Sequence, residues 1–220
     1  MLGLFFVAMT VVSTMRFLLL ARRTRQAPEL HLGLMSLCLG GSVVVGLIED
    51  VPRVASGVLS GAGAILNLAF VVSVLRVPAV RLAAYAVGSL CALSVAASIG
   101  WGEVPGSATS VGRQAACALS FLLAATGFAS HAALARKKLA IGLASALELV
   151  GFRLLSAAEL SLGLAFVVRA LGEVGDARAE EILLLQLPLA VLGALCSWLA
   201  LAPPGWLKNR LEHSAQSEPV

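Results

Sequence analysis

Charged side chains are scarce in this sequence. Only 13% of the 220 residues are Asp, Glu, Lys or Arg, whereas about a quarter of a soluble domain is charged. Hydrophobic residues make up 59% of the chain, and the mean hydropathy is +0.95. This composition excludes an ordinary soluble domain and indicates a protein that lies in a lipid bilayer.

The sequence also lacks a polar segment long enough to form a second domain. Its charges form short islands, and most of the apolar stretches between them are about 18 to 24 residues long, enough to cross roughly 30 Å of hydrocarbon as a helix. The remaining segments are too short to bury a core of their own. A separate soluble catalytic or ligand-binding domain is therefore excluded.

Cysteine is present, but not in any pattern that carries chemistry. No cysteine lies in a loop and no Cys-x-x-Cys pair occurs, which excludes a disulfide framework and the common zinc motifs. We interpret the four cysteines as small buried hydrophobic side chains. They are Cys38, Cys91, Cys117 and Cys196.

Seven apolar segments predict seven transmembrane helices. Because the loops between them are short, consecutive helices should be antiparallel neighbours. The predicted fold is an all-α integral membrane protein, a seven-transmembrane-helix up-down bundle that forms one domain over residues 1–202. A short cytoplasmic tail, 203–220, should be disordered at its end. The predicted helices are about 1–20, 30–48, 57–75, 82–99, 111–134, 139–171 and 182–202.

Basic residues gather in alternate connections, which predicts the orientation. Most follow the first, third and fifth segments or lie in the tail, so we expect the N-terminus outside and the C-terminus in the cytoplasm. These residues explain the pI near 9.2, and they predict contact with anionic lipid head groups, not with nucleic acid. They are Arg22, Arg23, Arg25, Arg76, Arg81, Arg136, Lys137, Lys138, Lys208 and Arg210.

The first segment resembles a signal peptide only in its apolarity. It lacks a basic region before it and a convincing cleavage site, so an uncleaved anchor is expected. With the chain's abundance of arginine and alanine, this suggests a multi-pass protein of a bacterial inner membrane.

The sixth segment carries Glu148, Arg153 and Glu159 within an apolar stretch of about 33 residues. An ionisable group at membrane depth is a candidate functional group. At 100° per residue both glutamates lie on one stripe with Ser145 and Ser156, and this stripe should face the bundle interior or a water-filled cavity.

Glu159 is the strongest candidate of this group. Asn67, near the middle of the third segment, is the obvious polar partner at the same depth. A buried and poorly paired carboxyl can keep its proton at neutral pH, as a proton relay or a hydrogen-bonding ligand site requires. The candidate ligand-binding or proton-linked residues are Glu159, Ser156, Glu148, Arg153 and Asn67.

An alternative interpretation concerns only the start of this segment. Ser-x-x-Glu is also a capping-box pattern, so Ser145 and Glu148 would begin the helix at the cytoplasmic surface. Arg153 would then extend its side chain toward the interface, and Glu159 alone would lie near the midplane. His31 and His131 are expected to form hydrogen bonds at the interface.

Two known families share the predicted topology. The chain resembles the microbial rhodopsins in helix number and orientation, but their retinal is held by a lysine in the seventh helix. Here the lysines are Lys137, Lys138 and Lys208, so a retinal Schiff base is excluded and no cofactor is predicted. The chain is similar to seven-helix sugar transporters in size, yet the prolines of that family are absent from the first, third and fifth segments.

The favoured function is a small-molecule or lipid-binding and sensing protein with an intramembrane polar pocket on the sixth helix. A small-solute or proton-coupled transporter is the first alternative, and a subunit for assembly or structure of a membrane complex is the second. No cluster of nucleophiles or metal ligands at one depth is evident in the sequence, which argues against an intramembrane enzyme.

Overall fold

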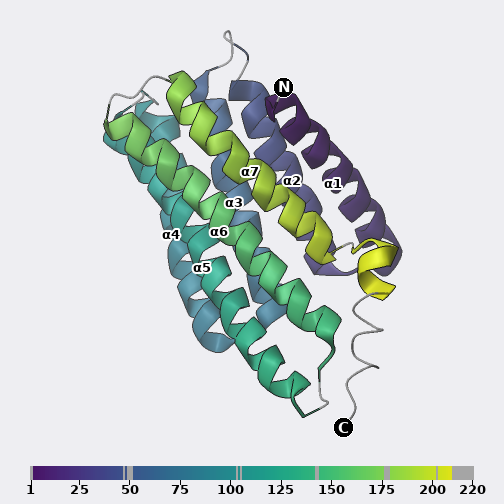
Figure 1. The fold of residues 1–220 in the computed structure, drawn as a ribbon. Coiled ribbons are helices and arrows are strands. Elements are labelled where there is room, and N and C mark those ends of the chain that lie inside the picture. Colours follow the sequence, from purple (N-terminus) through teal and green to yellow (C-terminus); the bar gives the residue numbers. More distant parts are fainter. Residues whose placement is uncertain are drawn as a thin grey trace.

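The computed structural model describes residues 2–46, 48, 52–102, 104, 106–141, 144–175, 179–201 and 203–209. Within these residues the chain forms seven long helices and no strand (Figure 1). The helices are α1 (Leu2–Thr24), α2 (Ala27–Gly46), α3 (Arg53–Leu75), α4 (Pro78–Trp101), α5 (Ala108–Leu139), α6 (Ala146–Val174) and α7 (Ala179–Leu201). The predicted disordered end of the tail, 210–220, lies outside the described residues.

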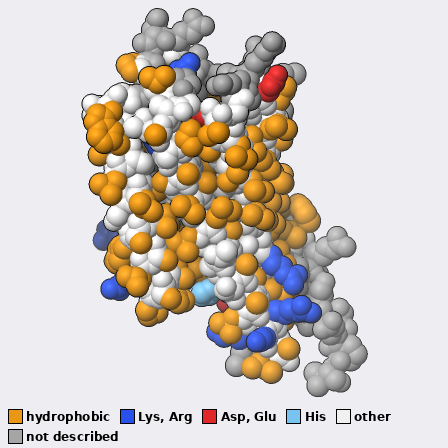
Figure 2. All heavy atoms as spheres, turned by 90° about the vertical axis from the view of Figure 1, so that its left-hand side faces the viewer, with side chains coloured by type: hydrophobic (Ala, Val, Ile, Leu, Met, Phe, Trp, Pro, Cys, Tyr) orange, Lys and Arg blue, Asp and Glu red, His pale blue; other side chains and the backbone are white. Residues whose placement is uncertain are grey.

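All seven helices of the described chain are long and apolar enough to cross a membrane. The prediction of an all-helical chain with seven segments that could span a membrane is confirmed. Figure 2 shows hydrophobic side chains over the middle of one face, while lysine and arginine side chains gather toward its lower end. Large apolar side chains such as Leu82 and Leu184 are exposed, as is expected of residues that contact lipid.

The helices pack in chain order, and the order closes on itself. Each helix contacts the next one, α7 also contacts α1, and α3 contacts α5 (Figure 1). In the described chain α3 and α6 do not pack closely together. The space between them is bridged by side chains.

The largest difference from the predicted boundaries lies between α5 and α6. The apolar run from 139 to 171 predicted one long segment, but Leu139 ends α5 and α6 begins at Ala146. The hydroxyl of Ser145 accepts a hydrogen bond from the Glu148 backbone N–H at 3.1 Å, which stabilises the first turn. The capping interpretation therefore holds, and Glu148 is exposed instead of facing the interior. Hydropathy alone cannot show such a break because the connecting residues are themselves apolar.

Small residues allow close contacts between helices. A Cβ atom at Gly193 of α7 would lie 2.8 Å from Cγ of Leu162 and 3.0 Å from the carbonyl oxygen of Ala158, both in α6. The backbone oxygen cannot rotate away as a side chain can. Close backbone approach of this kind supports packing where lipid removes the hydrophobic effect between helices.

Gly193→Leu should therefore separate α6 from α7 and lower the free energy of unfolding by about 1–3 kcal/mol, as overpacking does. The measurement is the Tm of the purified protein in detergent, followed by circular dichroism. Gly112→Leu is the matched control, because a Cβ atom at Gly112 meets nothing within 4 Å. An equal Tm for the two variants would contradict this account of the α6–α7 contact.

Candidate functional site

Glu159 and Asn67 meet at the centre of the bundle. Both side chains are buried, with 1% and 0% of their surface exposed. The Asn67 amide nitrogen Nδ2 donates a hydrogen bond of 2.8 Å to Oε2 of Glu159. Because α3 and α6 do not pack closely in the described chain, this bond spans the space between them. The partner expected from depth alone is the one that the structure shows.

The amide oxygen of Asn67 has no hydrogen-bond partner among the described residues. Leaving such a buried acceptor unpaired costs free energy unless a protonated group or a ligand donates a hydrogen bond to it. Buried aromatic rings lie along the helices on both sides of the pair. Phe121 and Phe166 stack with centroids 5.5 Å apart, and Phe70 lies 5.9 Å from Phe128. These rings keep the surroundings of the pair apolar, which strengthens its hydrogen bond.

The other predicted site residues lie away from this pair. The Ser156 hydroxyl donates a hydrogen bond of 3.0 Å to the backbone oxygen of Ala125 in α5. Arg153 is exposed one turn closer to the start of α6, and Glu148 is exposed near the helix start. The predicted five-residue site is thus divided into a buried pair, a cleft lined by Ser156 and Arg153, and one exposed glutamate.

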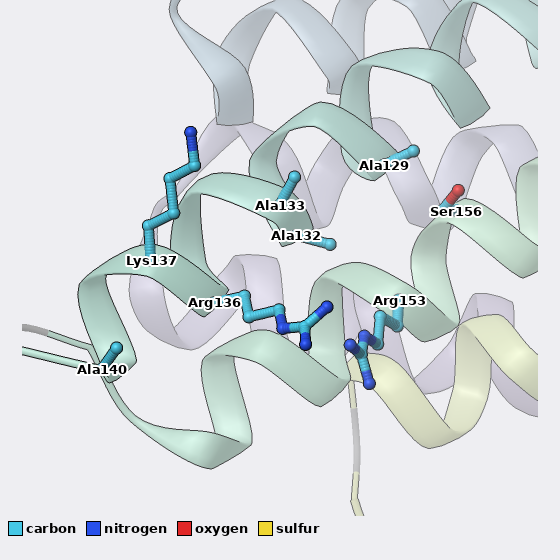
Figure 3. A pocket seen from close by; sticks show the side chains of 8 residues that line it. All are labelled: Ala129, Ala132, Ala133, Arg136, Lys137, Ala140, Arg153 and Ser156. Atoms are coloured by element: carbon cyan, nitrogen blue, oxygen red, sulfur yellow. The ribbon is translucent and has the colours of Figure 1, made fainter.

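The cleft lies between the end of α5 and the start of α6 and has a volume of about 670 Å³. This volume is in the range of small-molecule sites. Figure 3 shows the guanidinium groups of Arg136 and Arg153 directed toward one another, whereas Lys137 extends away from them. The lining residues are Ala129, Ala132, Ala133, Arg136, Lys137, Ala140, Arg153 and Ser156.

A second group of polar side chains occupies the opposite ends of α5 and α6. Arg113 of α5 is only 1% exposed, and its Nη1 donates a hydrogen bond of 2.8 Å to the hydroxyl of Ser60 in α3. With its amide oxygen facing the two guanidinium groups, Gln114 accepts from Nη2 of Arg113 at 3.2 Å and from Nε of Arg169 at 3.0 Å. Gln114 therefore joins α5 to α6 between two positive charges.

Glu173 completes this group. Its Oε1 lies 3.6 Å from Nε of Arg169 one helical turn away, and its Oε2 accepts a short hydrogen bond from the Ser110 hydroxyl. The carboxylate stabilises the guanidinium of Arg169 and joins α6 to the first turn of α5. We refer to Ser60, Ser110, Arg113, Gln114, Arg169 and Glu173 as the outer polar network, where outer means the end of α5 and α6 that lies opposite the cleft.

The sequence pattern does not indicate this network, for an identifiable reason. The predicted sixth segment ends at residue 171, so Glu173 falls in the connection after it, where charges are normally solvated. One signal was present, because Glu173 lies about 40° from Glu159 on the helical wheel of α6. A wheel shows which face of one helix is polar, but it does not show which residues of α3 and α5 that face meets.

The expected hydrogen bond is found for His131, whereas Nδ1 of His31 has no hydrogen-bond partner among the described residues. The Nδ1 atom of His131 lies 3.1 Å from the backbone oxygen of Gly127, and the ring packs against Phe152. Among the described residues, no three His, Cys, Asp or Glu side chains are placed to hold a metal ion.

Gln114→Leu should lower the free energy of unfolding by about 1–3 kcal/mol for each buried donor that loses its acceptor. Gln114→Glu should be tolerated, because a carboxylate accepts from both guanidinium groups. The measurement is the Tm of each variant in the same detergent. If the leucine variant unfolds at the same temperature as the glutamate variant, Gln114 does not join the two arginines.

Comparison with known proteins adds no relative to this description. The chain matches no protein-family model, no curated protein sequence and no solved structure.

Proposed function

We propose that this chain is a binding or sensing protein of a bacterial inner membrane that accepts a small hydrophobic or lipid-like molecule between α5 and α6. The seven helices form an up-down bundle, with the N-terminus outside and the C-terminus in the cytoplasm. The gathering of lysine and arginine side chains toward one end of the face in Figure 2 supports this orientation.

The observation that carries the proposal is the cleft, together with the buried Glu159–Asn67 pair one helical turn beyond Ser156. Ser156 lines the cleft, and Glu159 lies one turn deeper along α6. The unused oxygen of Asn67 and the carboxyl of Glu159 are buried polar groups in an apolar setting. A ligand that enters between α5 and α6 would place its apolar part against the alanines and its polar atoms near these groups.

Sensing requires that the ligand changes something at the membrane surface. The cleft is formed by the last turns of α5 and the first turns of α6, so an occupant would alter the contact between these ends. The connection between them follows the basic residues Arg136, Lys137 and Lys138. A cytoplasmic partner that binds this basic turn would detect the change.

A proton-coupled or small-solute carrier is the second candidate, and the outer polar network favours it. Polar side chains occur at three depths of the helices: the outer network, the Glu159–Asn67 pair, and the cleft with Ser156 and Arg153. A carrier needs polar groups that are accessible from both sides of the membrane. In this protein the phenylalanines near the central pair would have to move to connect them.

Binding is tested by native mass spectrometry of the detergent-purified protein, with an ultraviolet-visible spectrum of the same sample. We expect a retained small molecule or lipid in the wild type and in Glu159→Gln, which keeps an acceptor for Asn67. Glu159→Leu should lose it, because it removes the polar atoms next to the cleft. A wild-type protein that carries nothing, or equal retention in the leucine variant, would contradict this site.

Transport is tested by reconstituting the protein into liposomes with a pH-sensitive dye inside. A carrier should move protons or solute at a rate that Glu159→Gln lowers, since glutamine cannot release a proton. Arg22→Gln, at an exposed position of α1 away from these polar groups, serves as the control variant. If liposomes that contain the wild type or the variant show the same flux as protein-free liposomes, the carrier function is excluded for the solutes tested.

A further inference from the structure

Two arginines face each other across the cleft without an acidic partner. Arg136 comes from α5 and Arg153 from α6, and Figure 3 shows their guanidinium groups directed toward one another. The lining contains no carboxylate, and among the described residues neither arginine forms an ion pair. Two positive groups that are directed toward one another repel unless an anion lies between them.

Part of the wall of the cleft is apolar and made of short side chains. Ala129, Ala132 and Ala133 occupy one face of α5 at a spacing of three and four residues. These short side chains leave room in the cleft, whose volume is about 670 Å³. The cleft therefore combines an anion-attracting entrance with a wall that suits a hydrocarbon chain.

The position of the cleft relates these two properties to a bilayer. The arginines lie near the helix ends, since Leu139 ends α5 and Ser145 caps α6. Ser156 and Ala129 lie further from these helix ends than the arginines do, toward the apolar middle of the bundle. A phospholipid has the same order of groups, with phosphate at the interface and acyl chains in the hydrocarbon.

We propose that the cleft binds one anionic phospholipid, with its phosphate between Arg136 and Arg153 and an acyl chain along the alanines of α5. The proposal rests on the proposed binding function and keeps its cleft, but it places the polar part of the ligand at the arginines instead of near Glu159 and Asn67. Guanidinium groups bind phosphate oxygens through paired, charge-assisted hydrogen bonds. Basic pockets between transmembrane helices on the cytoplasmic side bind anionic head groups in this way.

The test uses the full chain in a neutral detergent, titrated with phosphatidylglycerol and followed by native mass spectrometry. Phosphatidylcholine is the neutral comparison. We expect one phosphatidylglycerol to stay bound under conditions that remove phosphatidylcholine. Arg136→Gln with Arg153→Gln should weaken this binding about tenfold or more. Equal retention of the two lipids would overturn the proposal.

A charge-matched control separates the cleft from the basic surface. Arg22→Gln with Arg23→Gln removes the same charge from exposed positions of α1, and should leave the affinity for phosphatidylglycerol within about twofold. If this variant loses as much affinity as the cleft variant, the binding is general surface attraction and the proposed site is wrong.

A steric variant keeps every charge and also guards against a failure of the arginine variant to fold. Ala129→Leu with Ala133→Leu places two side chains into the cleft, and it should abolish retention of phosphatidylglycerol. Unchanged binding would overturn the proposed position of the acyl chain. Glycerol phosphate at millimolar concentration should not displace the lipid; displacement would show that the site takes a soluble phosphate instead.

These outcomes distinguish the two proposals. The wild type could retain a different molecule that Glu159→Leu loses, while phosphatidylglycerol binding does not depend on the two arginines. This result would support the binding function and refute the phospholipid as its ligand. Arginine-dependent phosphatidylglycerol binding that Glu159→Leu leaves unchanged would support the lipid site and refute the role of the central pair.

Discussion

Hydrocarbon offers no water to a polar group, and this constraint determines how the rest of the molecule is arranged. Each helix satisfies its backbone hydrogen bonds internally, so only the polar side chains still need partners. Buried serines satisfy their hydroxyls on the preceding turn, as Ser60 and Ser120 do through the carbonyl oxygens of Gly57 and Cys117. Longer polar side chains must reach another helix. Asn67 reaches Glu159, and Arg113 reaches Ser60, so the polar groups collect where α3, α5 and α6 face one another.

The charges of the arginines are accommodated in opposite ways at the two ends of α5 and α6. In the outer polar network, Arg113 is buried, and Gln114 together with Glu173 provides acceptors for the two guanidinium groups there. At the cleft, Arg136 and Arg153 are exposed and face each other without a carboxylate in the lining. A network whose guanidinium groups have acceptors within the protein stabilises the helix pair, whereas the arginine pair at the cleft is where we propose that a ligand binds. The same residue type thus suggests structure at one end and binding at the other.

Particular residues show how far the pattern of the chain predicts this arrangement. Asn67 and Glu159 were paired from their depth in two apolar segments, because an amide and a carboxyl at the same depth have few other partners. Ser145 and Glu148 allowed either a stripe facing inward or a helix cap, and the exposure of Glu148 decides for the cap. The role of Gln114 cannot be predicted from the sequence, because a glutamine in an apolar run has no preferred partner until α6 lies beside it. The cleft was also not foreseen, because Arg136 and Arg153 belong to different helices.

The sequence by itself determined that the chain is helical, that seven segments can span a membrane, and which residues are too polar for lipid. These properties depend on length, hydropathy and short-range capping, and each is local to a stretch of chain. The tertiary structure decided which polar groups meet, because a hydrogen bond between α3 and α6 depends on the rotation and depth of both helices. It also decided that Ser156 and Arg153 line a cleft while Glu159 is sealed next to Asn67. Residues only one turn apart on α6 differ in this way because the helices packed around them differ.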